Sequence, residues 1–256
     1  MDDDEYDDYY LDQDRVDLRD RGYFNEVTDQ GRVEGECCYA HAAVGAVEYL
    51  HHRKQHGQNR VILSPQDIYN NLVYGQNGVE EDAQEDDEVD KHAKTSMQTL
   101  AWICENGCVL QAACPYTGVA VPPKPLAERR NDVRLRIETF KPVKLRNLED
   151  HVRTIGPVIA AIDWVKELDN WGAEDVIYTG PVDAAAFDGA EGHSVLVMGF
   201  GPDYWLVRNS HGVNWGNAGY AKFTRAKVHG RFLIDGCWAP VGIAYRDPGG
   251  ADYNAI

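Results

Sequence analysis

The apolar residues in the first half of the chain follow a helical spacing. The clearest run occupies positions i, i+3, i+4 and i+7 of one face: Ala40, Ala43, Val44 and Val47. This spacing predicts an α-helix over about 38–52. Ser64 and Pro65 suit an N-cap and a first helical position, so a second helix is predicted to begin there. A third helix is predicted over 95–106 and ends before Gly107.

The second half of the chain carries short apolar runs separated by turns, which is the pattern of β-strands. Strands are predicted over five ranges: 137–140, 158–162, 194–200, 204–209 and 221–224. A helix is expected around 148–155, where Gly156 and Pro157 end it. The Gly-Pro-Asp turn at 201–203 would join two of the strands as a hairpin.

This change of pattern predicts an α+β protein of three parts. Residues 1–16 form an acidic tail, 17–132 a helical domain and 133–256 a β-rich domain with a mostly antiparallel sheet or barrel. The proline-bearing stretch 118–131 is expected to mark the crossing between the two domains.

A thiol is predicted at the start of the first helix. Cys38 follows a polar, glycine-bearing loop and stands in the first helical turn, where unpaired N–H groups and the helix dipole favour an anion. It should ionise more readily than a free cysteine. The predicted hairpin carries His193 at the start of one strand and Asn209 at the end of the other, so the two side chains can meet. Cysteine, histidine and an orienting amide form a nucleophilic constellation.

Four motifs follow one another along the chain. They are Gln30-Gly31, Cys38-Tyr39-Ala40, Gly192-His193-Ser194-Val195, and the run Asn-Ser-His-Gly-Val-Asn-Trp-Gly-Asn-Ala-Gly-Tyr from Asn209 to Tyr220. In this order they resemble the signatures of the papain-like cysteine proteases. The resemblance implies a two-lobed α+β fold. One lobe is helical, the other is antiparallel and β-barrel-like, and the active site lies in the cleft between them.

The resemblance also implies an activity, which is hydrolysis of peptide bonds through a thioester acyl-enzyme. Cys38 would attack the carbonyl, His193 would take and return the proton, and Asn209 would orient His193. The Gln30 amide and the backbone N–H of Cys38 would stabilise the oxyanion. A peptide or protein is the expected substrate, and no cofactor is expected.

Five residues are expected to bind substrate, again by resemblance. Asn77, Gly78 and Val79 would line the cleft on the side before the scissile bond, where an extended peptide pairs with backbone. Trp215 is expected on the leaving-group side, and Gly192 lies next to His193.

The chain departs from the family pattern close to the expected site. The departures are Glu36, Val79, His211, and two additional residues between Gln30 and Cys38. They favour a second hypothesis, a protease-like protein that has lost turnover and binds a peptide or protein partner. Acyl transfer or deamidation by the same thiol is a third hypothesis.

The other cysteines leave alternatives open. Cys37 competes with Cys38 as the nucleophile, although aligning it would displace Tyr39 and Ala40 from the motif. The vicinal pair could also act as a redox switch. The remaining four cysteines fit no standard zinc spacing and are expected to be buried thiols: Cys104, Cys108, Cys114 and Cys237. No metal site is therefore predicted, and the histidines His51, His52 and His56 are expected to form a surface cluster at a helix end.

Composition narrows the possible partners. The chain has 256 residues, 43% of them hydrophobic, and a formal net charge of −17, concentrated in residues 2–20 and 80–90. Nucleic-acid binding is disfavoured, because phosphate contacts need clustered Lys and Arg. No apolar run is long enough to cross a membrane. A basic protein partner or a protein inhibitor is possible.

The chain is expected to stay in the cytosol or nucleus. Its first residues are acidic, unlike the basic start and apolar stretch of a secretory signal. Gly35 and Gln76 stand where relatives pair two cysteines, and the loss of both partners suggests a reducing compartment.

Overall fold

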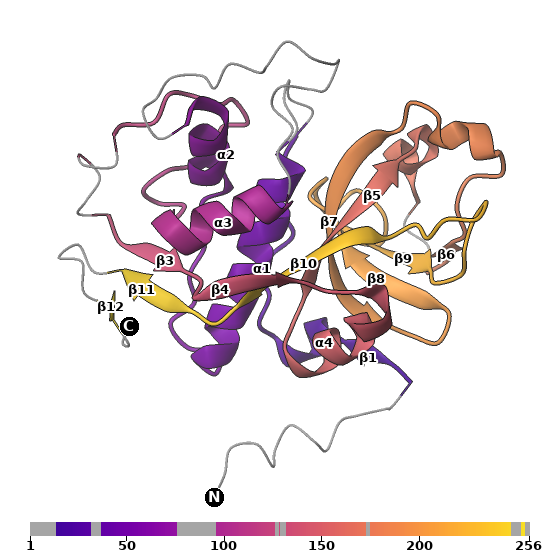
Figure 1. The fold of residues 1–256 in the computed structure, drawn as a ribbon, viewed down its shortest axis with the longest axis horizontal. Helices are drawn as coiled ribbons and strands as arrows, with labels where there is room; N and C mark the ends of the chain where they lie inside the picture. The colour runs from indigo at the N-terminus through magenta and orange to yellow at the C-terminus, as the bar shows by residue number, and fades with distance from the viewer. Residues whose placement is uncertain are drawn as a thin grey trace, which may run out of the picture.

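The computed structural model has two lobes, one formed by helices and the other by a twisted sheet (Figure 1). The structure describes residues 14–31, 37–75, 96–125, 128, 132–172, 175–246 and 252–253. In chain order the helices and strands are β1 (Val16–Asp17), α1 (Cys38–Lys54), α2 (Pro65–Tyr74), α3 (Ser96–Asn106), β2 (Cys108–Val109), β3 (Arg134–Arg136), β4 (Thr139–Pro142), α4 (Leu148–Thr154), β5 (Val158–Trp164), β6 (Ile177–Tyr178), β7 (Glu191–Phe200), β8 (Tyr204–Arg208), β9 (Tyr220–Thr224), β10 (Asp235–Val241), β11 (Ala244–Arg246) and β12 (Asp252–Tyr253).

The helical lobe packs α1, α2 and α3 around one apolar core. Helix α2 begins as its sequence predicts, with Pro65 in the first turn and the Ser64 hydroxyl accepting the N–H of Asp67. That cap satisfies one of the backbone N–H groups that a helix start leaves unpaired. Within the described part of the chain, no helix is both long and apolar enough to cross a membrane.

The second lobe is built on an eight-stranded sheet with the order β4-β10-β5-β7-β8-β9-β6, to which β1 adds by pairing with β7. All pairs are antiparallel except β6 with β9. The prediction of an antiparallel sheet is confirmed. The sheet does not close into a complete barrel, because the end strands β4 and β6 do not pair with each other among the described residues.

Helix α1 lies between the lobes and is buried on almost every side. Gly45 permits a close approach to β7, since a Cβ at that position would lie 3.3 Å from Leu196 Cδ2. The expected surface cluster of histidines is wrong for His51 and His52, which are both 0% exposed. Their ring nitrogens bond backbone atoms of Tyr23, Asn59 and Val61 instead of meeting solvent.

The two ends of the described chain cross between the lobes. Strand β1, from the N-terminal part, pairs with β7 in the sheet lobe. Strand β11, near the C-terminus, pairs with β3, which itself pairs with β2 of the helical lobe. The division of the sequence into 1–16, 17–132 and 133–256 stays a prediction.

Candidate active site

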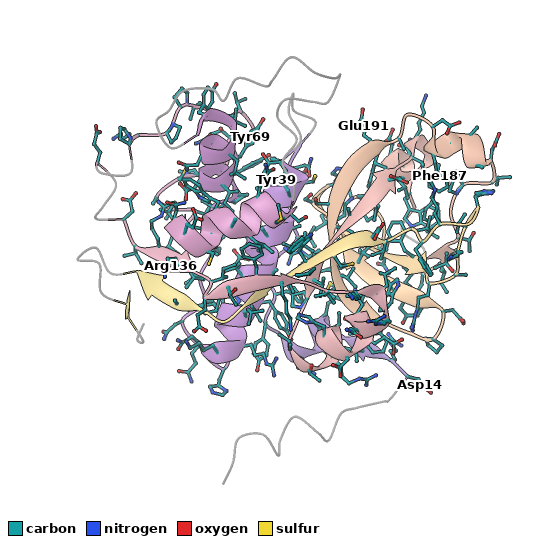
Figure 2. All side chains as sticks on the ribbon, viewed as in Figure 1. Asp14, Tyr39, Tyr69, Arg136, Phe187 and Glu191 are labelled. Carbon is teal, nitrogen blue, oxygen red and sulfur yellow. The ribbon has the colours of Figure 1, made fainter. Side chains whose placement is uncertain are left out.

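Cys38 is the first residue of α1 and lies where the helix meets the sheet lobe. Its side chain is 4% exposed, and its sulfur accepts the backbone N–H of Ser194 at 3.3 Å. Ser194 follows His193 on β7, so this contact brings the predicted nucleophile and the predicted base to one place. In Figure 2, Tyr39 lies near the centre of the molecule on α1, and Glu191 lies at the upper end of β7 in the sheet lobe.

The two adjacent thiols have different surroundings. Cys37 Sγ lies 3.0 Å from the Tyr116 hydroxyl, which donates to the Gln30 carbonyl at 2.8 Å. Burial, together with Cys37, raises the pKa of the Tyr116 phenol well above its usual value, so the hydroxyl keeps its single proton. Either atom can be the donor in the contact between Cys37 and Tyr116. Cys37 thus packs against Tyr116 in the helical lobe, whereas Cys38 faces β7.

His193 and Asn209 meet across the hairpin of β7 and β8, as its pattern predicts. His193 Nε2 lies 2.7 Å from Asn209 Oδ1, and the two residues are 4% and 3% exposed. The same oxygen accepts the backbone N–H of Ser210 at 2.8 Å. Since an amide oxygen only accepts, Nε2 must carry a proton. The neutral imidazole therefore has its basic lone pair on Nδ1.

Gln30 is fixed to the loop that follows Asn209. Its backbone N–H donates to the Ser210 carbonyl at 2.7 Å, and the Ser210 hydroxyl donates to Gln30 Oε1 at 2.5 Å. Asp29 and His211 add an isolated β-bridge beside these bonds. The oxygen of the Gln30 amide is thereby occupied, and its NH₂ group is the end left to face a ligand.

Trp164 packs against His193 and His211, and it was not among the predicted site residues. Its ring centroid lies 4.5 Å from that of His193 and 4.8 Å from that of His211. His211 itself lies 5.0 Å from His193. Trp164 ends β5, and β5 pairs with β7 so that Ile162 stands opposite His193. Side chains alternate along a strand, so Trp164 lies on the same face of β5 as Ile162. The sequence could have predicted this position only if the pairing of β5 with β7 were already known.

A cleft of about 780 Å³ opens beside His193. Trp215, one of the predicted substrate-binding residues, lines it together with Trp164, and Trp215 donates its ring N–H to the Leu168 carbonyl at 2.7 Å. Gly192 is exposed on β7 next to His193 but does not line this cleft. Asn77, Gly78 and Val79 lie outside the described residues, as does Glu36.

Neither a metal site nor a disulfide is found among the described residues. No three His, Cys, Asp or Glu side chains in that part of the chain are arranged to hold a metal ion. The six cysteines, all of them described, form no disulfide. Cys108 and Cys237 are buried as predicted, whereas Cys104 and Cys114 are only half-buried. Burial raises the pKa of the Cys237 thiol to about 12, so it stays protonated.

Comparisons with known sequences agree with this geometry. The family described as "Papain family cysteine protease" matches residues 13–234. Cathepsin L1 of Drosophila melanogaster is 30% identical over 222 residues, which cover 83% of this chain and 54% of the relative. A probable cysteine protease of Arabidopsis thaliana, RDL4, is 32% identical over 244 residues, covering 90% of this chain and 57% of the relative. The chain thus spans a little over half the length of the curated relatives it matches.

Solved structures share the fold. A cysteine protease of Carica candamarcensis, CMS1MS2, in complex with E-64 superposes with a TM-score of 0.69 at 21% identity, covering 89% of this chain and 98% of the other. The bromelain protease of Ananas comosus, also in complex with E-64, gives a TM-score of 0.68 at 20% identity, with coverage of 90% and 99%. The prediction of a two-lobed papain-like α+β fold is confirmed.

The relatives also correct the expected location. Cathepsin L proteins and procathepsins such as that of the Tenebrio molitor larval midgut are secreted or lysosomal, so the expectation of a cytosolic or nuclear protein is wrong. That expectation rested largely on the first residues of the chain, and the family match begins only at residue 13.

Sequence, fold and site geometry agree. The family match covers most of the chain, and the motifs that carry the resemblance lie together where α1 meets the β7–β8 hairpin. This chain belongs to the papain family of cysteine proteases.

Proposed function

We propose that the protein is a cysteine peptidase that hydrolyses peptide bonds with Cys38 as its nucleophile. One arrangement carries the proposal: the Cys38 sulfur contacts the strand that holds His193, and His193 Nε2 is bonded to Asn209 at 2.7 Å. Cysteine nucleophiles need a base held by a third group, and these residues supply that set of roles.

The first half of the reaction forms an acyl-enzyme. The thiol proton of Cys38 passes to His193 Nδ1, and the thiolate attacks the carbonyl carbon of the scissile bond. Negative charge then develops on the carbonyl oxygen, where the Cys38 N–H and the Gln30 NH₂ group would donate. Each such donor contributes about 10²–10³ in rate. His193 then gives its proton to the leaving amine, and a thioester remains on Cys38.

The second half releases the acid. Water replaces the amine, and His193 Nδ1 takes a proton from it as the oxygen attacks the thioester. Collapse of the intermediate expels Cys38 as a thiolate. Throughout, Asn209 keeps the Nε2 proton of His193 directed at its own oxygen, so that Nδ1 remains the nitrogen that exchanges protons.

Covalent labelling tests this proposal. An irreversible epoxide probe for thiols should modify the folded protein once, with the adduct mapping to Cys38 by peptide mass spectrometry. Hydrolysis of fluorogenic peptides should stop in parallel. Cys38→Ala should abolish both, and the matched change Cys104→Ser, at a half-buried cysteine of α3, should alter neither. An adduct on Cys37 in place of Cys38 would contradict the assignment.

A second candidate is a protease homologue that binds a peptide or protein without turnover. Its support is His211, a titratable ring 5.0 Å from His193 at a position where the family carries an indole. A basic protein or a protein inhibitor would be a suitable partner for so acidic a chain. Reversible binding of a peptide aldehyde, without epoxide labelling at any pH between about 5 and 8, would favour this candidate over the peptidase.

A further inference from the structure

A small cavity beside Asn209 is lined by three residues that each carry a buried polar atom without a partner among the described residues. The cavity has a volume of about 10 Å³, and Thr28, His41, Arg208 and Asn209 are among the residues that line it. Within the described part of the chain, three buried atoms of these residues have no hydrogen-bond partner: His41 Nε2, Arg208 Nη1 and Asn209 Nδ2. Buried polar atoms in folded proteins almost always have partners, so this coincidence calls for a physical explanation.

A single small molecule that can both accept and donate hydrogen bonds could pair with all three atoms. Arg208 Nη1 and Asn209 Nδ2 can only donate. His41 Nε2 accepts when the ring is neutral and its proton is on Nδ1, and the Thr28 hydroxyl lies 2.9 Å from Nδ1, ready to accept that proton. Burial, aided by the charge of Arg208, lowers the pKa of His41 to about 3. The ring is therefore neutral over the whole range in which the enzyme would work.

We propose that this cavity binds one water molecule, which accepts hydrogen bonds from Arg208 and Asn209 and donates one to His41. A buried water needs roughly 10–15 Å³ and two to four polar partners. The cavity lies at the lower end of that volume and offers three partners. His41 thereby becomes a positioning residue for Asn209, acting through the water.

The consequence concerns both ends of the Asn209 amide. Its oxygen bonds His193 and the N–H of Ser210, and the water would hold its nitrogen. An amide held at both ends cannot rotate, so the imidazole of His193 keeps its orientation. This positioning role rests on the proposed function, whereas the water site does not.

The variants follow from the hydrogen-bond pattern. His41→Phe keeps a ring but removes the acceptor, and His41→Gln restores an acceptor oxygen. Thr28→Val removes the acceptor for the Nδ1 proton and lets the ring exchange tautomers. The matched control is His151→Phe. His151 is also buried, has a pKa lowered to about 4 by burial, and its Nε2 has no partner among the described residues, but it lies on α4 and does not line the cavity.

The functional readout is the rate at which iodoacetamide alkylates Cys38, measured between about pH 4 and 9. His41→Phe should lower the rate at neutral pH about tenfold and move the midpoint of the profile to higher pH, because one buried hydrogen bond is lost behind Asn209. His41→Gln should recover most of the rate, and Thr28→Val should lie between them. His151→Phe should leave the profile unchanged even if it lowers the melting temperature. An unaltered profile for His41→Phe would overturn the positioning role.

The water itself is tested separately. A high-resolution crystal structure should show an ordered water within hydrogen-bond distance of all three atoms, and nitrogen NMR of His41 should place its proton on Nδ1. A dry cavity, or a proton on Nε2, overturns the water site. If the wild-type protein hydrolyses no peptide but its Cys38 alkylation still depends on His41, the proposed function fails while this inference stands. If Cys38 is not alkylated at all, the positioning role falls with the proposed function.

Discussion

Ser210 supports two of the proposed catalytic groups at once. Its backbone N–H bonds the oxygen of Asn209, and its hydroxyl bonds the oxygen of Gln30. In each case the amide oxygen is occupied, which fixes where the amide nitrogen points. One small buried residue therefore sets the orientation of the side chain behind His193 and of the expected oxyanion donor.

Ser210→Ala should lower kcat about tenfold with little change in KM, since the Gln30 amide would lose its anchor without being removed. Steady-state hydrolysis of a fluorogenic peptide measures both constants. The control is a double-mutant cycle with Gln30→Ala, in which Ser210→Ala should cause a much smaller further loss. Fully additive losses would show that the hydroxyl acts on something other than Gln30.

Trp164→Ala should lower kcat about tenfold, because water would reach the bond between His193 and Asn209 and compete for it. Trp164→Phe should keep most of the activity by preserving the cover. The comparison is Trp171→Ala. Trp171 also lines the cleft, but its ring packs on Tyr178 at 4.9 Å, so its loss should raise KM more than it lowers kcat. Equal effects of the two alanine variants on kcat would argue against a shielding role for Trp164.

The sequence was sufficient to select Cys38, His193, Asn209 and Gln30 as candidates, because each belongs to a short local pattern. It was insufficient for Ser210, Trp164 and His41 as supporting residues. Their roles depend on which strand lies beside β7 and on the contact between the loops at 29–31 and 209–212. Such pairings between distant segments follow from packing and not from local spacing.

At the scale of elements, a buried ion pair connects the parts of the helical lobe. Arg134 of β3 lies 2.6 Å from Asp67 of α2, with side chains 7% and 1% exposed. The same guanidinium donates to the carbonyls of Asn106 and Gly107 at the end of α3. A single side chain therefore connects β3, α2 and α3.

Arg134→Met should lower the free energy of unfolding by about 3–5 kcal/mol, because it leaves the Asp67 carboxylate buried without its cation. Urea unfolding measures the loss, and adding Asp67→Asn should recover part of it. The matched control is Arg231→Met. Arg231 pairs with Asp163 at 2.8 Å, but both side chains are about half exposed, so the loss should stay below about 1 kcal/mol.

The elements themselves were largely predictable. The helices predicted over about 38–52 and 95–106 are observed at Cys38–Lys54 and Ser96–Asn106, since their apolar spacing is regular and their ends carry stop signals. Strand β10 was missed although it lies between β4 and β5 in the sheet. It contains Gly236 and Pro240, which locally indicate a turn, and its pairing with β5 shifts register. This segment is extended because it pairs with β4 and β5 on either side.

At the scale of the whole molecule, the buried carboxyl of Glu48 links stability to pH. Burial raises its pKa from 4.5 to about 7, although the N–H of Leu63 bonds it at 2.7 Å. A raised pKa means that the folded protein binds the proton more tightly than the unfolded chain. The stabilisation of the folded state by the protonated Glu48 carboxyl is complete below pH 4.5, the pKa of the unfolded chain. It is lost as pH rises through about 7, the pKa of the folded protein.

Glu48→Gln should remove this loss. Between about pH 5 and 8, the wild-type free energy of unfolding should fall by on the order of 2 kcal/mol more than that of the variant. Urea unfolding at the two pH values measures the difference. Glu105→Gln, an exposed change on α3, is the control and should follow the wild type. Parallel pH dependence of Glu48→Gln and wild type would contradict the assignment.

The crossing of the chain ends makes each lobe structurally incomplete by itself. A cut between residues 118 and 131 would leave β1 on a fragment without its partner β7, and β11 and β3 on a fragment without β2 and helices α1, α2 and α3. Neither half would then contain a whole core. We expect such halves to remain largely unstructured when separate and to regain order only when mixed, so the molecule should fold as one cooperative unit despite its two-lobed form.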